Sequence, residues 1–170
     1  SKLDSYPYAA ISAYALHSLY GSIETIAGEK YASIVKHLVV LKDQLNALPD
    51  VDYEAVMELK WEAYSLLYQA MAVESFGEEA YSSFFQENRH WLVPYAAYSY
   101  LRDKFGTPDA SAWGKYSQFN VSLINELCEP GSQQFDSIAL HYFIQYHLHL
   151  QLKSAHDYAN QNGLILKGDI

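Results

Sequence analysis

Residues 135–158 read FDSIALHYFIQYHLHLQLKSAHDY, a stretch whose apolar and amphipathic side chains recur every three or four positions. That spacing places them on one face of an α-helix. The set comprises Ile138, Tyr142, Gln145, Leu148 and Leu152. The stretch therefore predicts one long helix from Phe135 to Tyr158, which the glycine-containing residues 160–163 end.

Two helices are predicted earlier in the chain from the same period. The first covers residues 29–45, and the second is capped by Asp52 and stops before Gly77. On the second helix, charged side chains at helical spacing predict a solvated face. These side chains are Glu54, Glu58, Lys60 and Glu62.

Residues 78–105 also carry a helical pattern, interrupted by Pro94. Proline lacks an amide donor and clashes with the preceding turn, so a kink or a break is expected there. A capped turn and short helix at 107–113 and a further helical stretch at 115–127 follow. The predicted fold is therefore mainly α-helical.

The pattern changes after this series of helices. Leu164–Leu166 is a short apolar run between Gly163 and Gly168, which predicts a buried strand. The chain is expected to contain one or two short strands at most. A helix, a glycine turn and a strand that ends in Gly168 and Asp169 form half of a βα unit, and the sequence stops where the next helix of that unit would begin. The C-terminus is therefore expected to be a cut within a larger fold.

The chain has 170 residues, and 20 acidic side chains against 11 basic ones give a formal charge of -9. Phosphate backbones and anionic membrane surfaces repel such a chain, so nucleic-acid and membrane partners are disfavoured. No stretch is apolar enough to predict a transmembrane helix. The single Cys128 cannot form an intramolecular disulfide, which is typical of a reducing compartment.

No residue pattern assigns a catalytic group, a metal site or a cofactor. His147 and His149 are two positions apart on the predicted helix, about 200° around its axis, so they cannot both ligate one ion. The sequence contains neither a Gly-x-Gly-x-x-Gly pattern nor a Walker phosphate loop. Cys128 is more simply a small hydrophobic residue than a nucleophile.

Two features are candidates for binding a ligand. Asp169 follows the predicted strand, where α/β barrels place active-site residues, although an aspartate that caps the next helix explains it equally well. Residues 4–15 lack a clean period, which favours either a ligand-contacting loop or a surface loop packed on the helices. The 16 tyrosines suit sugar stacking, but packing at the edges of a helical core explains them more simply.

Three stretches carry a family resemblance when taken together. They are DSYPYAAISAYA at residues 4–15, the pattern within residues 51–53 and 84–106, and FIQY at 143–146 followed by LILKGD at 164–169. The first is similar to an SPY…SAFA loop and the last to a GDLPI strand end. In that order and spacing they resemble the 4-α-glucanotransferases called amylomaltase or disproportionating enzyme, glycoside hydrolase family 77. Within this family, the residue pattern is most similar to that of the large cytosolic branch found in plants and some bacteria.

The resemblance implies a (β/α)8 TIM-barrel enzyme that breaks an α-1,4 glucosidic bond. A retaining double displacement would hold the donor on an aspartate and pass it to the 4-hydroxyl of an acceptor, with two carboxyl groups roughly 5–5.5 Å apart. The chain would then be a helical peripheral segment of that barrel. The substrate would be maltose, a maltooligosaccharide or starch, the location cytoplasmic, and no cofactor would be needed.

The resemblance also assigns substrate-binding positions residue by residue. Tyr8 falls on the family's cleft tyrosine near the donor sugar, and Asp169 falls on a strand-end aspartate of the same region. Ser12 belongs to the loop of Tyr8 and is the third candidate. An extra residue before Pro7, and Ser18 where a proline is common, depart from the family pattern and bear on the path of this loop.

In this family the catalytic carboxylates, including the nucleophilic aspartate and the acid/base glutamate, follow the Gly-Asp strand end, downstream of Ile170. Residues 1–170 are therefore expected to be one partial domain that is inactive by itself. If residues 164–166 lack a partner strand, they are expected to be poorly ordered, to pack on the helices, or to pair between chains as a dimer or a domain swap. The alternative is a free-standing helical module that binds carbohydrate or protein without catalysis.

Overall fold

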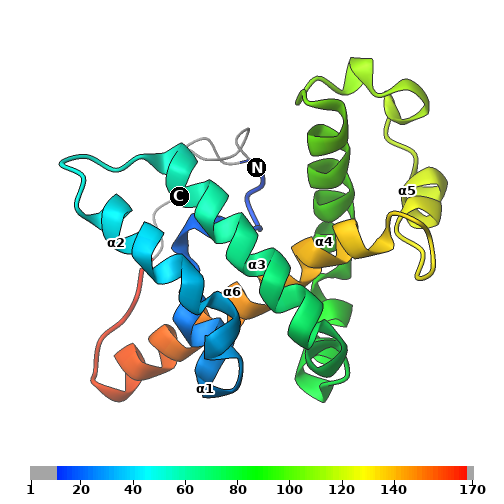
Figure 1. The fold of residues 1–170 in the computed structure, drawn as a ribbon. Coiled ribbons are helices and arrows are strands. Elements are labelled where there is room, and N and C mark those ends of the chain that lie inside the picture. The colour runs from blue at the N-terminus through cyan, green and yellow to red at the C-terminus, as the bar shows by residue number, and fades with distance from the viewer. Residues whose placement is uncertain (1–10, 168–170) are drawn as a thin grey trace.

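The computed structural model describes residues 11–167, and their regular structure is entirely helical (Figure 1). No β-strand occurs in this part of the chain, and none of its helices has the length and apolar composition needed to cross a bilayer. Short 3-10 turns lie at Ser18–Tyr20, Lys36–Leu38, Ala110–Ala112 and Gly114–Tyr116. The α-helices are α1 Ile23–Val35, α2 Val39–Asn46, α3 Tyr53–Phe76, α4 Glu79–Phe105, α5 Val121–Leu127 and α6 Phe135–Gln161. The expectation of a mainly α-helical chain is confirmed.

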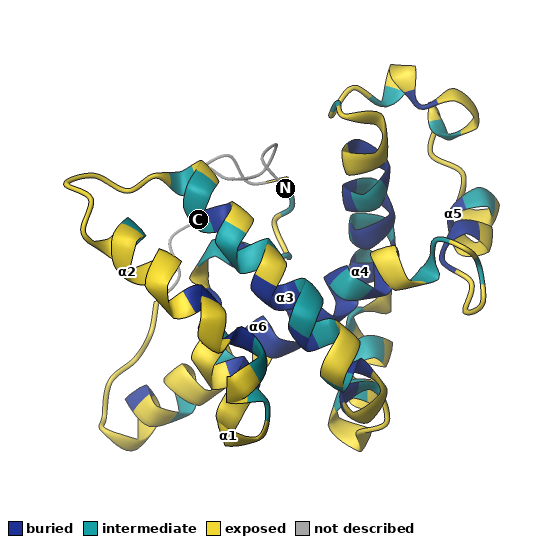
Figure 2. Ribbon diagram, in the orientation of Figure 1, coloured by how far each residue is buried: buried dark blue, intermediate teal, exposed yellow. Residues whose placement is uncertain are grey.

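Helix α6 is the centre of the packing. It crosses behind α3 and in front of α4 in the view of Figure 1, and these two helices diverge from their short connection at Gly77 and Glu78. Residues 141–148 are all buried, and Figure 2 shows the middle of α6 as buried. Tyr142 and Tyr146 belong to a core with α4 and α5, whereas Phe143 and Ile144 belong to a core with α1 and α3. The middle of α6 is therefore buried on all sides, not on one face as its period predicts.

Helices α3 and α4 have the predicted boundaries. Asp52 Oδ1 accepts a hydrogen bond from the Ala55 amide at 3.0 Å and caps α3. Gly106 ends α4 with φ 67°, in the left-handed region that favours glycine. Of the kink or break expected at Pro94, the break is wrong, because α4 continues through this residue. Buried residues on both sides, within 92–97, pack against the core and offset a cost of about 3 kcal/mol for an internal proline.

The single helix expected over residues 29–45 is wrong. Helix α1 begins earlier, at Ile23, and a 3-10 turn at Lys36–Leu38 separates it from α2. Within α1, Gly28 has φ 53° and ψ -164°, a conformation that only glycine adopts readily. Hydrophobic period alone does not reveal this interruption, since the side chains around it keep their helical spacing.

The predicted strand at Leu164–Leu166 is also wrong. Helix α6 ends at Gln161, Gly163 follows with φ 72°, and the amide of Leu164 donates to the Ala159 carbonyl at 2.9 Å. The three residues of the run are 61%, 89% and 53% exposed. A strand requires a neighbouring strand for its backbone hydrogen bonds, and residues 11–167 contain none.

We predict that His147 makes stability depend on pH. It is 8% exposed, its Nε2 has no hydrogen-bond partner among the described residues, and burial lowers its pKa to about 4. Between pH 6.5 and 4 the unfolded chain binds a proton that the folded chain does not, so the free energy of unfolding should decrease by up to about 3 kcal/mol as the pH falls. Urea denaturation should show a flatter pH dependence for His147→Leu.

The exposed His149 on the same helix provides the control. His149→Leu should keep the native pH dependence over this window. Equal slopes for His147→Leu and the native chain would show that the burial of His147 does not cause the effect.

Candidate functional site

Of the three substrate-binding candidates, the structure describes only Ser12; Tyr8 and Asp169 lie outside residues 11–167. The Ser12 hydroxyl oxygen accepts hydrogen bonds from the amides of Tyr14 and Ala15, each at 3.1 Å. These bonds close a turn at residues 12–15. Ser12 therefore shapes the turn at residues 12–15.

The backbone after this turn is held by two glutamine side chains of α6, which we call the amide clamps. Gln145 Oε1 accepts from the Leu16 amide at 2.9 Å, and its Nε2 donates to the Leu16 carbonyl at 2.8 Å. Gln151 bonds the amide and the carbonyl of Ser22 in the same way, at 2.9 and 3.0 Å. Each clamp satisfies both backbone groups of one residue.

Helix α3 supplies two further partners to the same segment. The Tyr64 hydroxyl donates to the Ser18 carbonyl at 2.6 Å. Lys60 Nζ donates to the carbonyls of Leu19 and Gly21, the latter at 2.7 Å. Burial lowers the pKa of Lys60. The expectation that Lys60 lies on a solvated face is wrong, because its ammonium group serves two backbone carbonyls.

Together these side chains give the backbone of residues 16–22 the hydrogen bonds that a neighbouring strand would otherwise provide. Backbone groups that are withdrawn from water need partners, and this segment forms only one 3-10 turn of its own. Gln145 is 3% exposed and Tyr64 is fully buried, so the bonds are shielded from solvent. The one sequence signal for them is a glutamine within an otherwise apolar helix face.

Aromatic side chains lie beside the turn at residues 12–15. The Tyr14 ring stacks on Trp91 of α4, with centroids 6.1 Å apart and planes inclined by 14°, and its edge meets His90. Trp91 Nε1 donates to Asn88 Oδ1 at 2.9 Å, which fixes the indole. Tyr14 is nevertheless 65% exposed. Such rings offer flat apolar faces with polar edges, a surface on which a sugar ring can stack.

The histidines and Cys128 do not form a second site. His147 is buried and His149 is exposed, so they lie on different faces as expected. No group of three or more histidine, cysteine, aspartate or glutamate side chains within residues 11–167 could hold a metal ion. Burial raises the pKa of the Cys128 thiol, which disfavours the nucleophilic thiolate.

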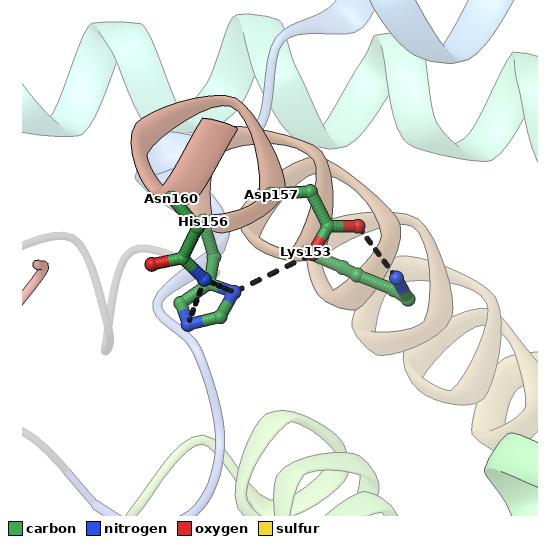
Figure 3. Close-up of polar contacts among 4 residues, drawn as sticks. All are labelled: Lys153, His156, Asp157 and Asn160. Carbon is green, nitrogen blue, oxygen red and sulfur yellow. Dashed lines mark hydrogen bonds and ion pairs between the residues drawn. The ribbon is translucent and has the colours of Figure 1, made fainter. Parts of the chain in front are cut away.

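A polar cluster on the last turns of α6 has a simple structural explanation (Figure 3). Asp157 accepts from Lys153 Nζ at 2.6 Å and lies 3.5 Å from His156 Nδ1, while Asn160 Nδ2 is 3.2 Å from the His156 ring nitrogens. The hydrogen bond from Lys153 lowers the pKa of Asp157. Apart from the adjacent pair 156 and 157, the partners lie four residues apart on an exposed helix face, which is ordinary surface pairing.

A groove of about 960 Å³ lies between α1, α2 and α3, and residues 19–22 form part of its lining. Its walls are mainly apolar, with Ile23, Leu38 and Leu59 among the lining residues. Lys42 and Glu24 form an ion pair within this lining. The groove and the aromatic set around Tyr14 share no residue.

Comparison with known proteins gives one consistent result. A family model described as 4-alpha-glucanotransferase matches residues 1–170. The chain is 38% identical over 167 residues to the rice protein named 4-alpha-glucanotransferase DPE2, a match that covers 98% of the chain and 18% of the rice protein. It is 27% and 28% identical to the 4-alpha-glucanotransferases of Chlamydia caviae and Chlamydia pneumoniae, covering 98% of the chain and 31% of each. No solved structure matches.

We predict that Gly21 is required by close packing. Its φ is -65°, which any residue adopts, but an added Cβ would overlap the Tyr64 hydroxyl and lie 3.2 Å from Leu148 Cδ2. Gly21→Ala should therefore lower the free energy of unfolding by about 1–3 kcal/mol in urea denaturation. In a Tyr64→Phe background the overlapping oxygen is absent, so the same substitution should cost less. An equal cost in both backgrounds would exclude this overlap as the cause.

Proposed function

Since the chain belongs to the 4-alpha-glucanotransferase family, we propose that it is part of an enzyme that transfers α-1,4-glucan segments from a donor to the 4-hydroxyl of an acceptor sugar. Residues 1–170 would form a helical peripheral segment of the (β/α)8 catalytic barrel. The substrates would be maltose, maltooligosaccharides or starch, and the enzyme would act in the cytoplasm. The names of the relatives support the reaction, and the chain spans only 18% and 31% of their lengths.

The observation that carries this proposal is the side-chain bonding of residues 16–22. The segment directly follows the loop that resembles the family's sugar-cleft loop, residues 4–15. A binding loop contributes affinity only if its shape is kept without substrate, because ordering it on binding costs conformational entropy. The Ser12 turn and the Gln145 clamp fix residues 12–16, the part of the chain that continues directly from this loop.

In the proposed mechanism the chain binds and orients the donor. Tyr8 would contact the donor sugar, Asp169 would hold the same region of the cleft, and Ser12 would shape the loop. The catalytic carboxylates of the retaining reaction would come from residues that follow the Gly-Asp end, as the resemblance implies. Transfer to a sugar in place of water requires an acceptor held in position, and exposed rings such as Tyr14 suit that task.

The relatives that match 98% of the chain are named as glucanotransferases, which favours the enzyme over a free-standing binding module. Self-association of residues 1–170 stays a prediction. The exposed apolar run at 164–166 is the surface that would support it.

The first functional prediction concerns activity. The full-length protein containing this chain should convert maltotriose into glucose and longer maltooligosaccharides, whereas residues 1–170 alone should release no glucose, since the catalytic carboxylates are expected elsewhere. Chromatography of the products measures both. Glucan transfer by residues 1–170 alone would refute the assignment of the carboxylates, and an inactive full-length protein would refute the proposed function.

The second functional prediction concerns Tyr8. In the full-length protein Tyr8→Ala should reduce kcat/KM for maltotriose by about 10- to 100-fold, because the loss of one or two good contacts in the transition state has this size. Tyr158→Ala, which removes a 70% exposed tyrosine near the end of α6, is the control and should keep the native value. Equal kinetics for the two variants would remove Tyr8 from the site.

A further inference from the structure

A second groove lies where α5 packs beside α4 (Figure 1), and we call it the α4–α5 groove. It consists of two adjoining hollows of about 450 and 290 Å³. Both hollows are lined by Pro94 of α4, by Ile124 of α5 and by Phe119 of the loop that precedes α5, so Phe119 lies where they meet. Small-ligand sites in proteins have volumes of roughly 300–1,000 Å³. The two hollows together have the size of such a site.

The Phe119 ring is exposed although the loop that carries it is fixed. Before the ring, the Ser117 amide donates to the Gly114 carbonyl at 3.0 Å. After it, Asn120 Oδ1 accepts from the Leu123 amide at 3.1 Å. The ring itself is 72% exposed. An aromatic ring that an ordered loop holds in water offers a flat apolar face on which a sugar ring can stack.

Further aromatic rings line the smaller hollow. Tyr98 and Tyr116 are half-buried there, and Trp113 is buried. The rings of Tyr98 and Trp113 have centroids 5.2 Å apart, and Trp113 Nε1 donates to the Thr107 carbonyl at 3.1 Å. The indole is therefore fixed, and this hollow has an aromatic wall.

Planar polar side chains line the larger hollow and are exposed. They are Gln86, Arg89 and His90 of α4 and Asn125 of α5. Arg89 is the one aspartate, glutamate, lysine or arginine among the residues that line the two hollows. Amide and guanidinium groups make hydrogen bonds in fixed directions. This lining suits an uncharged ligand with many hydroxyl groups.

The groove between α1, α2 and α3 has a different lining. Tyr20 is the one aromatic residue among those that line it. Five charged side chains also line it, namely Glu24, Glu29, Lys36, Lys42 and Lys60. Aliphatic walls offer no ring on which a sugar can stack. Of the two grooves, the α4–α5 groove therefore has the lining that fits a sugar.

The α4–α5 groove also leads towards the turn at residues 12–15. His90 lines its larger hollow, and the His90 and Tyr14 rings have centroids 6.0 Å apart. Tyr14 in turn stacks on Trp91. A chain of sugars that lies in the groove can therefore continue to these exposed rings, so the ligand that fits is longer than one sugar.

We propose that the α4–α5 groove binds a stretch of a linear α-1,4-glucan. The Phe119 ring lies against one sugar, and the polar side chains of the larger hollow bond to hydroxyl groups. The choice of α-1,4-glucan as the sugar chain rests on the proposed function.

The test is affinity electrophoresis of the full-length protein in gels that contain glycogen, a branched α-1,4-glucan. Phe119→Ala removes the ring, and Asn125→Ala removes one amide from the larger hollow. Tyr158→Ala is the matched control, because it removes a 70% exposed ring of α6 that lines neither hollow. Gels that contain dextran, whose sugars are mainly α-1,6-linked, show whether retardation requires the α-1,4 linkage. The melting temperature of each variant is measured alongside.

We expect Phe119→Ala to weaken glycogen binding about three- to tenfold at an unchanged melting temperature, since one exposed aromatic contact is lost. Asn125→Ala should weaken it less, and Tyr158→Ala should bind like the native protein. Equal binding by Phe119→Ala and the native protein would overturn the inference, as would equal retardation in dextran. A lowered melting temperature for Phe119→Ala would also overturn it, because it would show that another part of the protein covers the ring.

The proposed function is tested separately by the release of glucose from maltotriose. If the native protein is inactive but binds glycogen more tightly than Phe119→Ala does, the proposed function is refuted and the groove stands. If it is active but Phe119→Ala binds glycogen equally well, the groove is refuted and the function stands.

Discussion

The middle of α6 must be covered on every side, and the rest of the fold follows from this requirement. Residues 141–148 are buried without interruption, so no side of this stretch of α6 faces water. Helices α4 and α5 cover one side, and α1 and α3 cover the other. A helix that is apolar all round is stable in water only within such a shell. The V-shaped divergence of α3 and α4 is one way to place two long helices on it (Figure 1).

Residues 16–22 also cover α6, and they do so without regular α-helical structure. Their backbone amide and carbonyl groups are therefore withdrawn from water and need hydrogen-bond partners. The structure resolves the conflict with four long side chains, two from α6 and two from α3. Gln145 is the clearest example. Its polar side chain is tolerated in the core because it bonds to the Leu16 backbone, whose amide and carbonyl also need hydrogen-bond partners. The α6 core and the backbone at Leu16 therefore depend on the same residue.

The sequence predicts the parts of this fold that depend on period and capping. The helices around residues 53–76 and 135–161 and the Asp52 cap are of this kind, because repeated apolar spacing and a capping carboxylate are local signals. The interruption at Gly28, the unbroken helix at Pro94 and the unpaired run at Leu164–Leu166 depend on packing that no local pattern contains. For the site, the resemblance supplied Tyr8, Asp169 and Ser12. The bonding roles of Gln145 and Lys60 become visible only when distant segments are placed together.

The distance along the chain between each clamp and its target has a consequence for how the protein is made. Leu16 and Ser22 each bond to a glutamine 129 residues later. During synthesis residues 16–22 leave the ribosome long before α6 exists, and they cannot acquire their two glutamine partners until then. Contacts of such high sequence separation also form slowly, since the intervening chain must be ordered first. Residues 16–22 are therefore synthesised well before α6 but are fully fixed only after it, and they stay accessible to chaperones and proteases until α6 is complete.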